Sequence, residues 1–189
     1  MLWGPKDAVD LSRIQRALVV KLRHHGDVLL TTPVCSVLKR AIPSAEVDML
    51  VYADTRAMVE NHPAVQNVLA IDREWKLLSP LARLSREVSL LRQLRARHYD
   101  LLIHLSEHPR GAWLARILGC RYAVAPNFAK RSKFWRQSFT HHFALAKNAR
   151  RHMVEWNLDA LRRLGIAPQE EDKAPVLVPG TEAEAEVQR

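Results

Sequence analysis

Short apolar runs alternate along this chain with segments whose apolar residues recur every three or four positions. The apolar runs predict buried β-strands at residues 17–22, 46–52, 65–71, 100–105 and 121–125. The segments between and after them predict helices at residues 27–42, 54–61, 80–97, 111–118 and 152–164. Strands that alternate with helices in this way are typical of an α/β protein with a parallel sheet. The pattern therefore predicts a Rossmann-like, doubly wound parallel sheet.

The stretch from Arg16 to Arg40 combines the first strand, a short polar turn and a helix that we expect to open at Asp27. Gly26 in the turn would allow a backbone conformation that a side chain forbids. A carboxylate at position 27 would cap the helix and meet its positive end. This strand–turn–helix unit predicts polar groups at the carboxyl edge of the sheet, where α/β folds bind ligands.

Composition shifts suggest three parts of the chain. We expect a leader at residues 1–16, a Rossmann-like domain at 17–165, and a linker with the start of a second domain at 166–189. Within the last part, residues 175–179 predict a strand and residues 181–189 the first turns of a helix. Residues 126–142 predict a long basic loop that ends in a short strand.

The formal net charge of +9 favours a polyanionic partner, either nucleic acid, phospholipid headgroups or a phosphorylated glycan. A basic surface without such a partner is the alternative. Cys35 and Cys120 lie in apolar helical patterns, which predicts buried, reduced thiols and a cytoplasmic protein. The N-terminus lacks the apolar core of a secretory signal, and no apolar run is long enough to span a membrane.

Asp27 is the main candidate for catalysis. A carboxylate at a ligand-facing edge can act as a general base toward a substrate hydroxyl, although the same residue also suits an ordinary helix cap. Arg23, His24 and His25 in the preceding turn could contact phosphate or sugar oxygens.

Common nucleotide and metal motifs are missing. The turn at 23–26 has one glycine and matches neither GxGxxG nor GxxxxGK[ST], which weakens the hypothesis of a nicotinamide-dependent oxidoreductase. No HExxH motif or cysteine pair accompanies the histidines, so we predict no metal site.

The basic segment at 130–136 is interleaved with aromatic residues and has three interpretations. It could bind phosphate groups on an acceptor or membrane surface, bind single-stranded nucleic acid by charge and stacking, or be a solvated loop. Its candidate contact residues are Lys130, Arg131, Lys133 and Arg136.

The run KLRHHGDVLLTTP, followed by PSAEVDMLVY and NHPAVQNVLAID, resembles the opening of the ADP-heptose:lipopolysaccharide heptosyltransferases, glycosyltransferase family 9. The HMVEWNLDALRRLGI segment at 152–166 extends the resemblance over nearly the whole chain. The branch it most resembles is the heptosyltransferase III type, which adds the side-branch heptose of the inner core.

The resemblance implies the N-terminal half of a GT-B glycosyltransferase, with residues 17–165 as the acceptor-binding domain. It implies inverting, metal-independent transfer of heptose from ADP-heptose, without a further cofactor. Asp27 would be the base, and Arg23, His24, His25 and Gly26 would lie near the donor phosphates. The implied partners are the inner core of lipopolysaccharide and the anionic inner-membrane surface, on the cytoplasmic side, with no nucleic acid.

The sequence stops where the donor-binding domain of such an enzyme should begin. We therefore expect this chain alone to transfer little or no heptose. The alternative from a different functional class is a non-catalytic basic module that binds nucleic acid or another polyanion through residues 130–135.

Overall fold

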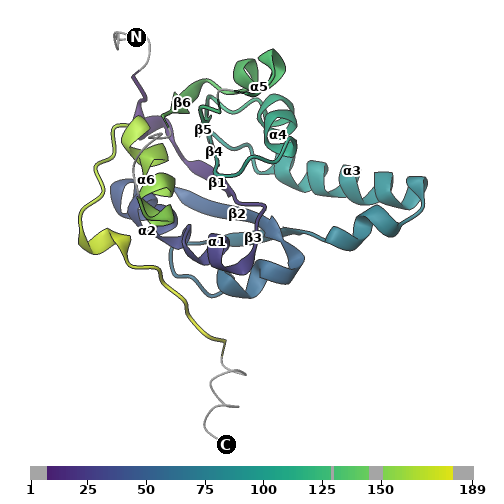
Figure 1. Ribbon diagram of the computed structural model, residues 1–189, viewed down its shortest axis with the longest axis horizontal. Coiled ribbons are helices and arrows are strands. Elements are labelled where there is room, and N and C mark those ends of the chain that lie inside the picture. Colours follow the sequence, from purple (N-terminus) through teal and green to yellow (C-terminus); the bar gives the residue numbers. More distant parts are fainter. Residues whose placement is uncertain (1–7, 129, 145–150, 181–189) are drawn as a thin grey trace, which may run out of the picture.

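The structure, a computed structural model, describes residues 8–128, 130–144 and 151–180. Six parallel strands form one sheet in the order β3-β2-β1-β4-β5-β6 (Figure 1). The strands are β1 (Arg16–Val20), β2 (Glu46–Tyr52), β3 (Asn67–Ile71), β4 (Leu101–His104), β5 (Tyr122–Pro126) and β6 (His141–Phe143). The chain builds one half of the sheet outward from β1 and the other half outward from β4, which is the doubly wound topology. The predicted fold class is confirmed.

Helices cover both faces of the sheet. They are α1 (His25–Leu29), α2 (Thr32–Ala41), α3 (Pro80–Ala96), α4 (Arg110–Leu118), α5 (Lys133–Ser138) and α6 (Met153–Arg163). Val19 of β1 packs into the core beneath α1, α2 and α6, whereas Leu18 and Val20 pack into the core beneath α3, α4 and α5. A parallel strand that is covered on both faces must be apolar on both, which explains the unbroken apolar runs in the sequence.

The helix expected over 27–42 is two helices. α1 ends at Leu29 and α2 begins at Thr32. The hydroxyl of Thr31 donates to the carbonyl of Asp27 (2.9 Å), and that of Thr32 donates to the carbonyl of Leu29 (2.8 Å). Pro33 has no backbone N–H that could donate to the carbonyl of Leu29, and the hydroxyl of Thr32 takes that place. The helix is therefore interrupted before Pro33, between Leu29 and Thr32.

Two other elements differ from their predictions. The short helix predicted at 54–61 is a 3-10 helix, η3 (Ala53–Met58), which ends three residues earlier than predicted. The expected loop at 126–142 contains α5, because Ser132 accepts a hydrogen bond from the backbone N–H of Trp135 (3.3 Å) and caps the helix. Trp135 then turns into the core and anchors this helix.

The chain ends also depart from the expectation. Ile14 is buried in the core and β1 begins at Arg16, so the last residues of the expected leader pack with the domain. Residues 175–179 form no strand; instead the backbone N–H of Val176 donates to the hydroxyl of Thr32 (2.9 Å). The helix expected at 181–189 lies outside the described residues.

Candidate active site

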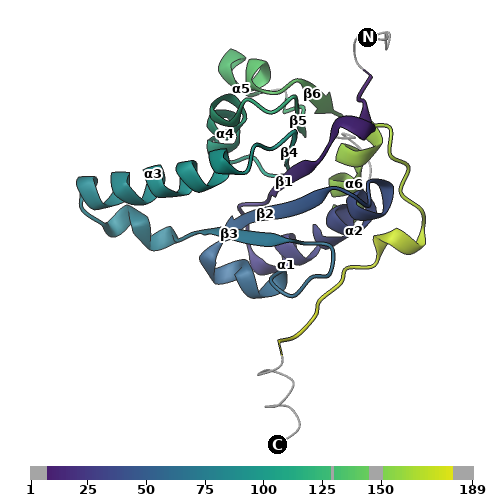
Figure 2. The ribbon, with the colours of Figure 1, turned by 180° about the vertical axis from the view of Figure 1, so that it is seen from behind.

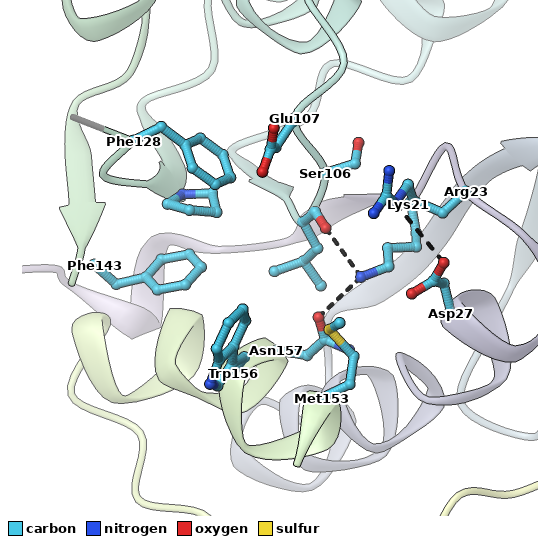
Figure 3. Close-up of a pocket in the computed structure, with 12 residues that line it drawn as sticks. Lys21, Arg23, Asp27, Ser106, Glu107, Phe128, Phe143, Met153, Trp156 and Asn157 are labelled. Carbon is cyan, nitrogen blue, oxygen red and sulfur yellow. Dashed lines mark hydrogen bonds and ion pairs between the residues drawn. The ribbon is translucent and has the colours of Figure 1, made fainter. Parts of the chain in front are cut away.

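A pocket lies at the carboxyl edge of the sheet, where β1 and β4 run side by side and the two halves of the fold diverge (Figure 3). Crevices at this position are the usual ligand sites of open α/β sheets. Glu107 and Phe128 enter the pocket from one side, and Trp156 and Asn157 of α6 enter from the other. The full lining is Lys21, Arg23, Asp27, Leu105, Ser106, Glu107, Pro126, Phe128, Phe143, Met153, Trp156 and Asn157.

Asp27 lines this pocket with 21% of its side chain exposed. It is the third residue of α1 and not the helix opening that the sequence predicted, since α1 begins at His25 and its N-cap is His24. An acidic residue in the first helical turn is still favoured by the free N–H groups there. Arg23 Nε lies 3.7 Å from Asp27 Oδ2, so a cation faces the carboxylate. The carboxylate is accessible from the pocket, as a base for an incoming hydroxyl requires.

Gly26 has a different role from the one predicted. It lies inside α1 with a negative φ, and a Cβ added there would meet no atom within 4 Å. The backbone therefore does not require glycine at this position. What glycine does provide is an open surface at the start of α1, next to the pocket.

The predicted turn residues lie at the rim. Arg23 lines the pocket with about half of its side chain exposed, whereas His24 and His25 are exposed and outside the lining. His24 makes no side-chain cap to α1. Their imidazoles are available to a ligand above the pocket, and their assignment to donor phosphates remains a prediction.

Lys21 is the main site residue that the sequence did not predict. Its side chain is buried, and its ammonium donates to the carbonyl of Leu105 (3.0 Å) and to Oδ1 of Asn157 (3.1 Å). Burial lowers the pKa of Lys21 to about 8, although the nearby Asp27 carboxylate opposes part of that effect. A lysine directly after an apolar strand was the available signal, because burying a charge is costly without a specific partner.

Asn157 connects three parts of the site. Besides accepting from Lys21, its amide donates to the carbonyl of Leu30 (2.8 Å) and lies 3.2 Å from the hydroxyl of Thr31. It therefore holds α6 against the junction of α1 and α2. An asparagine among the apolar positions of a predicted helix was the only sequence signal for it.

Glu107 is a second carboxylate in the same pocket, and it follows β4 at the carboxyl edge. Its side chain is 61% exposed, and Arg131 Nη2 lies 3.5 Å from Glu107 Oε2. No role was predicted for Glu107, because only the pairing of β4 with β1 brings it near Asp27.

The basic segment is ordered on the surface beside this pocket. Lys130, Lys133 and Arg136 are exposed, whereas Arg131 folds back onto the ring of Trp135 (5.1 Å) and the backbone of Glu107. Arg131 is thus the one of the four predicted contact residues that reaches the pocket lining.

The aromatic residues of this segment serve mostly the core. Trp135 and Phe139 are 3% and 6% exposed, and both contact the buried ring of His104, with the Phe139 ring stacked on it and the Trp135 ring tilted. Phe128, just before this segment, lines the pocket.

Cys35 and Cys120 are buried and unpaired, as predicted, and burial raises the pKa of each thiol to about 12. Within residues 8–128, 130–144 and 151–180, no three His, Cys, Asp or Glu side chains gather as metal ligands would. In the same residues, no helix is both long enough and apolar enough to cross a membrane.

Two solved glycosyltransferase structures share the fold of this chain. A glycosyltransferase of family 9 from Veillonella parvula matches with a TM-score of 0.77 at 22% identity, over 96% of this chain and 49% of that one. The E. coli heptosyltransferase WaaC with ADP-2-deoxy-2-fluoro heptose matches with a TM-score of 0.69 at 24% identity, over 82% of this chain and 50% of that one.

Sequence comparison gives the family. Residues 87–188 match the model of glycosyltransferase family 9 (heptosyltransferase), and the chain belongs to this family. It is 38% identical over 146 residues to lipopolysaccharide heptosyltransferase 3 of E. coli K12, which covers 77% of this chain and 41% of that relative. It is 33% identical over 106 residues to lipopolysaccharide heptosyltransferase 1 of Pseudomonas aeruginosa, which covers 55% of this chain and 30% of that relative. The chain thus spans less than half the length of these relatives. The predicted family is confirmed.

Proposed function

We propose that this chain supplies the acceptor-binding part of an inverting, metal-independent heptosyltransferase. The reaction would move heptose from ADP-heptose to the inner core of lipopolysaccharide. In this proposal residues 17–165 form the acceptor-binding domain, and residues 166–189 form a linker and the start of a donor-binding domain. The identity of 38% to a lipopolysaccharide heptosyltransferase 3 supports this choice of donor and acceptor.

The observation that carries the proposal is the position of Asp27. Its accessible carboxylate lies in the pocket at the diverging point of the sheet, with Arg23 beside it. In the proposed reaction an acceptor hydroxyl attacks the anomeric carbon of heptose from the face opposite the ADP. Asp27 takes the proton of that hydroxyl as the new bond forms, and ADP leaves with the electron pair of the broken bond.

The leaving diphosphate needs hydrogen-bond donors and positive charge. We assign this role to Arg23, His24, His25 and the open surface at Gly26, which lie at the rim directly before Asp27. The exposed Lys130, Lys133 and Arg136, with Arg131 at the pocket, would attract the phosphorylated core and an anionic membrane from the cytoplasmic side.

The nucleic-acid hypothesis has less support. Binding a single strand by stacking needs exposed aromatic faces. Trp135 and Phe139 are buried in the core, and Phe128 and Phe134 are only partly exposed, so residues 126–142 offer less aromatic stacking surface than their sequence suggested.

The test joins this chain to the carboxyl-terminal half of E. coli heptosyltransferase 3 and measures heptose transfer by the joined parent and its variants. Asp27→Asn should lower kcat by about 10²–10⁴-fold with little change in the free energy of unfolding. Asp10→Asn, an exposed aspartate before β1 at the other edge of the sheet, is the matched control and should keep its kcat. A kcat of Asp27→Asn within about twofold of the parent would remove Asp27 as the base.

The acceptor-domain assignment has its own test. Calorimetry with the 189-residue chain should show binding of lipopolysaccharide core oligosaccharide and much weaker binding of ADP-heptose. Tighter binding of ADP-heptose than of the oligosaccharide would contradict the assignment.

A further inference from the structure

The η4–α3 unit projects from the body of the molecule and carries leucines that contact no core. Figures 1 and 2 both show α3 extending away from the sheet, with the short helix η4 (Arg73–Leu77) leading into its free end. Leu77 and Leu81 at this end are 77% and 81% exposed, and Leu84 one turn later is 59% exposed. The packing of α3 on the domain uses Leu90 and Leu94 near its other end, which are 5% and 0% exposed. The projecting leucines are therefore not part of the fold's own core.

These leucines continue into an apolar surface on the neighbouring helix. Leu81, Leu84, Val88 and Leu91 follow the three- and four-residue spacing of one helix face. Leu91 then borders a hollow that Trp113 and Ile117 of α4 also line. Trp113 is 58% exposed, and its ring lies 4.7 Å from that of Phe134 on α5. We call this stretch, from Leu81 and Leu84 to Trp113, the leucine–tryptophan face.

Positive charge surrounds this face. Arg92 and Arg95 are exposed and continue the same stripe of α3. Lys130 and the N-terminus of α5 border the second hollow beside Trp113. Glu87 is the only acidic residue in α3, α4 and α5, and Arg110 neutralises it through two 2.7 Å hydrogen bonds. The charge around the face is therefore strongly positive.

We propose that the leucine–tryptophan face inserts into an anionic membrane surface. Exposed leucines and a tryptophan beside arginines and lysines are the composition of segments that lie in the headgroup region of a bilayer. Contact with a second copy of this chain would bring two positive surfaces together, which costs free energy. The choice of lipid rests on the proposed function, since a lipopolysaccharide acceptor is held in a membrane.

The position of the face suits that role. The projecting end of α3 follows β3 through η4, so it lies toward the carboxyl edge of the sheet, the edge that holds Asp27. The described C-terminal segment lies on the opposite layer, where Val176 contacts Thr32 of α2. A membrane against the leucine–tryptophan face would therefore lie near the site without covering that segment.

Vesicle sedimentation tests the proposal with the 189-residue chain. Vesicles of phosphatidylglycerol and phosphatidylcholine should bind the chain, and pure phosphatidylcholine vesicles should bind it at least about tenfold more weakly. Leu81→Ser with Leu84→Ser should reduce binding to the anionic vesicles by at least about tenfold, because both inserted side chains are lost. Arg92→Gln with Arg95→Gln should also reduce it, by about tenfold to thirtyfold.

The matched control is Leu177→Ser with Val178→Ser, which removes two exposed apolar side chains on the other layer. This control should bind as the parent does. Equal binding by the Leu81/Leu84 variant and the parent would overturn the proposal. A second result would also overturn it: the parent binds no vesicles but forms a concentration-dependent dimer in analytical ultracentrifugation, and the Leu81/Leu84 variant forms no dimer. The vesicles contain no lipopolysaccharide or ADP-heptose, so a lack of vesicle binding would not contradict the proposed transfer reaction. Likewise, the activity of Asp27→Asn has no bearing on vesicle binding.

Discussion

The ammonium of Lys21 donates a 3.1 Å hydrogen bond to the amide oxygen of Asn157, a residue 136 positions later in the chain. One partner follows β1 and the other lies on α6. The bond fixes α6 at the pocket wall and keeps a cation beneath Asp27, the proposed base (Figure 3).

Asn157→Ala should destabilise the fold. The substitution removes the acceptor for the buried Lys21 and the donor to the partly buried carbonyl of Leu30. Unsatisfied buried groups cost about 1–3 kcal/mol, so the free energy of unfolding should fall by that amount in urea titrations. Asn127→Ala, at an exposed position, is the control with the same chemical change. Equal stabilities of the two variants would show that Asn157 does not stabilise the site.

The buried Lys21 should make the free energy of unfolding depend on pH in the alkaline range. Its pKa is 10.5 in an unperturbed side chain and about 8 in the folded protein. Between these values the unfolded state binds more protons than the folded state, so stability rises with pH. Below pH 8 the folded protein bears the full cost of burying the charged ammonium. As the pH rises from about 8 to 10.5, the free energy of unfolding of the parent should therefore increase by about 3 kcal/mol relative to that of Lys21→Met.

Urea titrations of the parent and Lys21→Met at several pH values measure this difference. Lys133→Met, at an exposed position on α5, controls for loss of a lysine as such. A difference between parent and Lys21→Met that does not change with pH would mean that the ammonium is not desolvated as the structure indicates.

Two glycine-to-alanine substitutions should act in opposite directions. At Gly111 an added Cβ would lie 2.2 Å from Nε2 of the buried His104, so overpacking should cost about 1–3 kcal/mol. At Gly26 the added Cβ meets nothing and the backbone is helical, so alanine should stabilise by about 0.5–1 kcal/mol. Thermal unfolding of both variants checks the pair, and a loss of stability in Gly26→Ala would contradict this account of α1.

The variant Glu107→Gln distinguishes the roles of the two carboxylates in the pocket. Glu107 is 61% exposed and Asp27 is 21% exposed, so Glu107 is less constrained. In the joined protein, Glu107→Gln should lower kcat by less than about tenfold, against about 10²–10⁴-fold for Asp27→Asn. The reverse order of effects would transfer the role of base to Glu107.

The sequence was most reliable where local pattern and burial agree. The strand predicted at 46–52 matches β2 residue for residue, and the helix predicted at 80–97 differs from α3 by one residue. The predictions from sequence were wrong where a side-chain hydroxyl forms a hydrogen bond with a backbone group at a helix end. The hydroxyls of Thr31 and Thr32 break the helix predicted at 27–42, and Ser132 starts a helix where a loop was expected.

By itself, the sequence determined the order of strands and helices, the doubly wound class and the candidacy of Asp27, because apolar periodicity and turn composition are local properties. Only the tertiary structure decided which side chains share the pocket with Asp27. Lys21, Glu107 and Asn157 come from segments far apart in the chain, and they meet because β4 pairs with β1 and α6 packs across the first two helices. The tertiary structure also left Leu81 and Leu84 exposed, since a helical repeat shows an apolar face but not whether anything covers it.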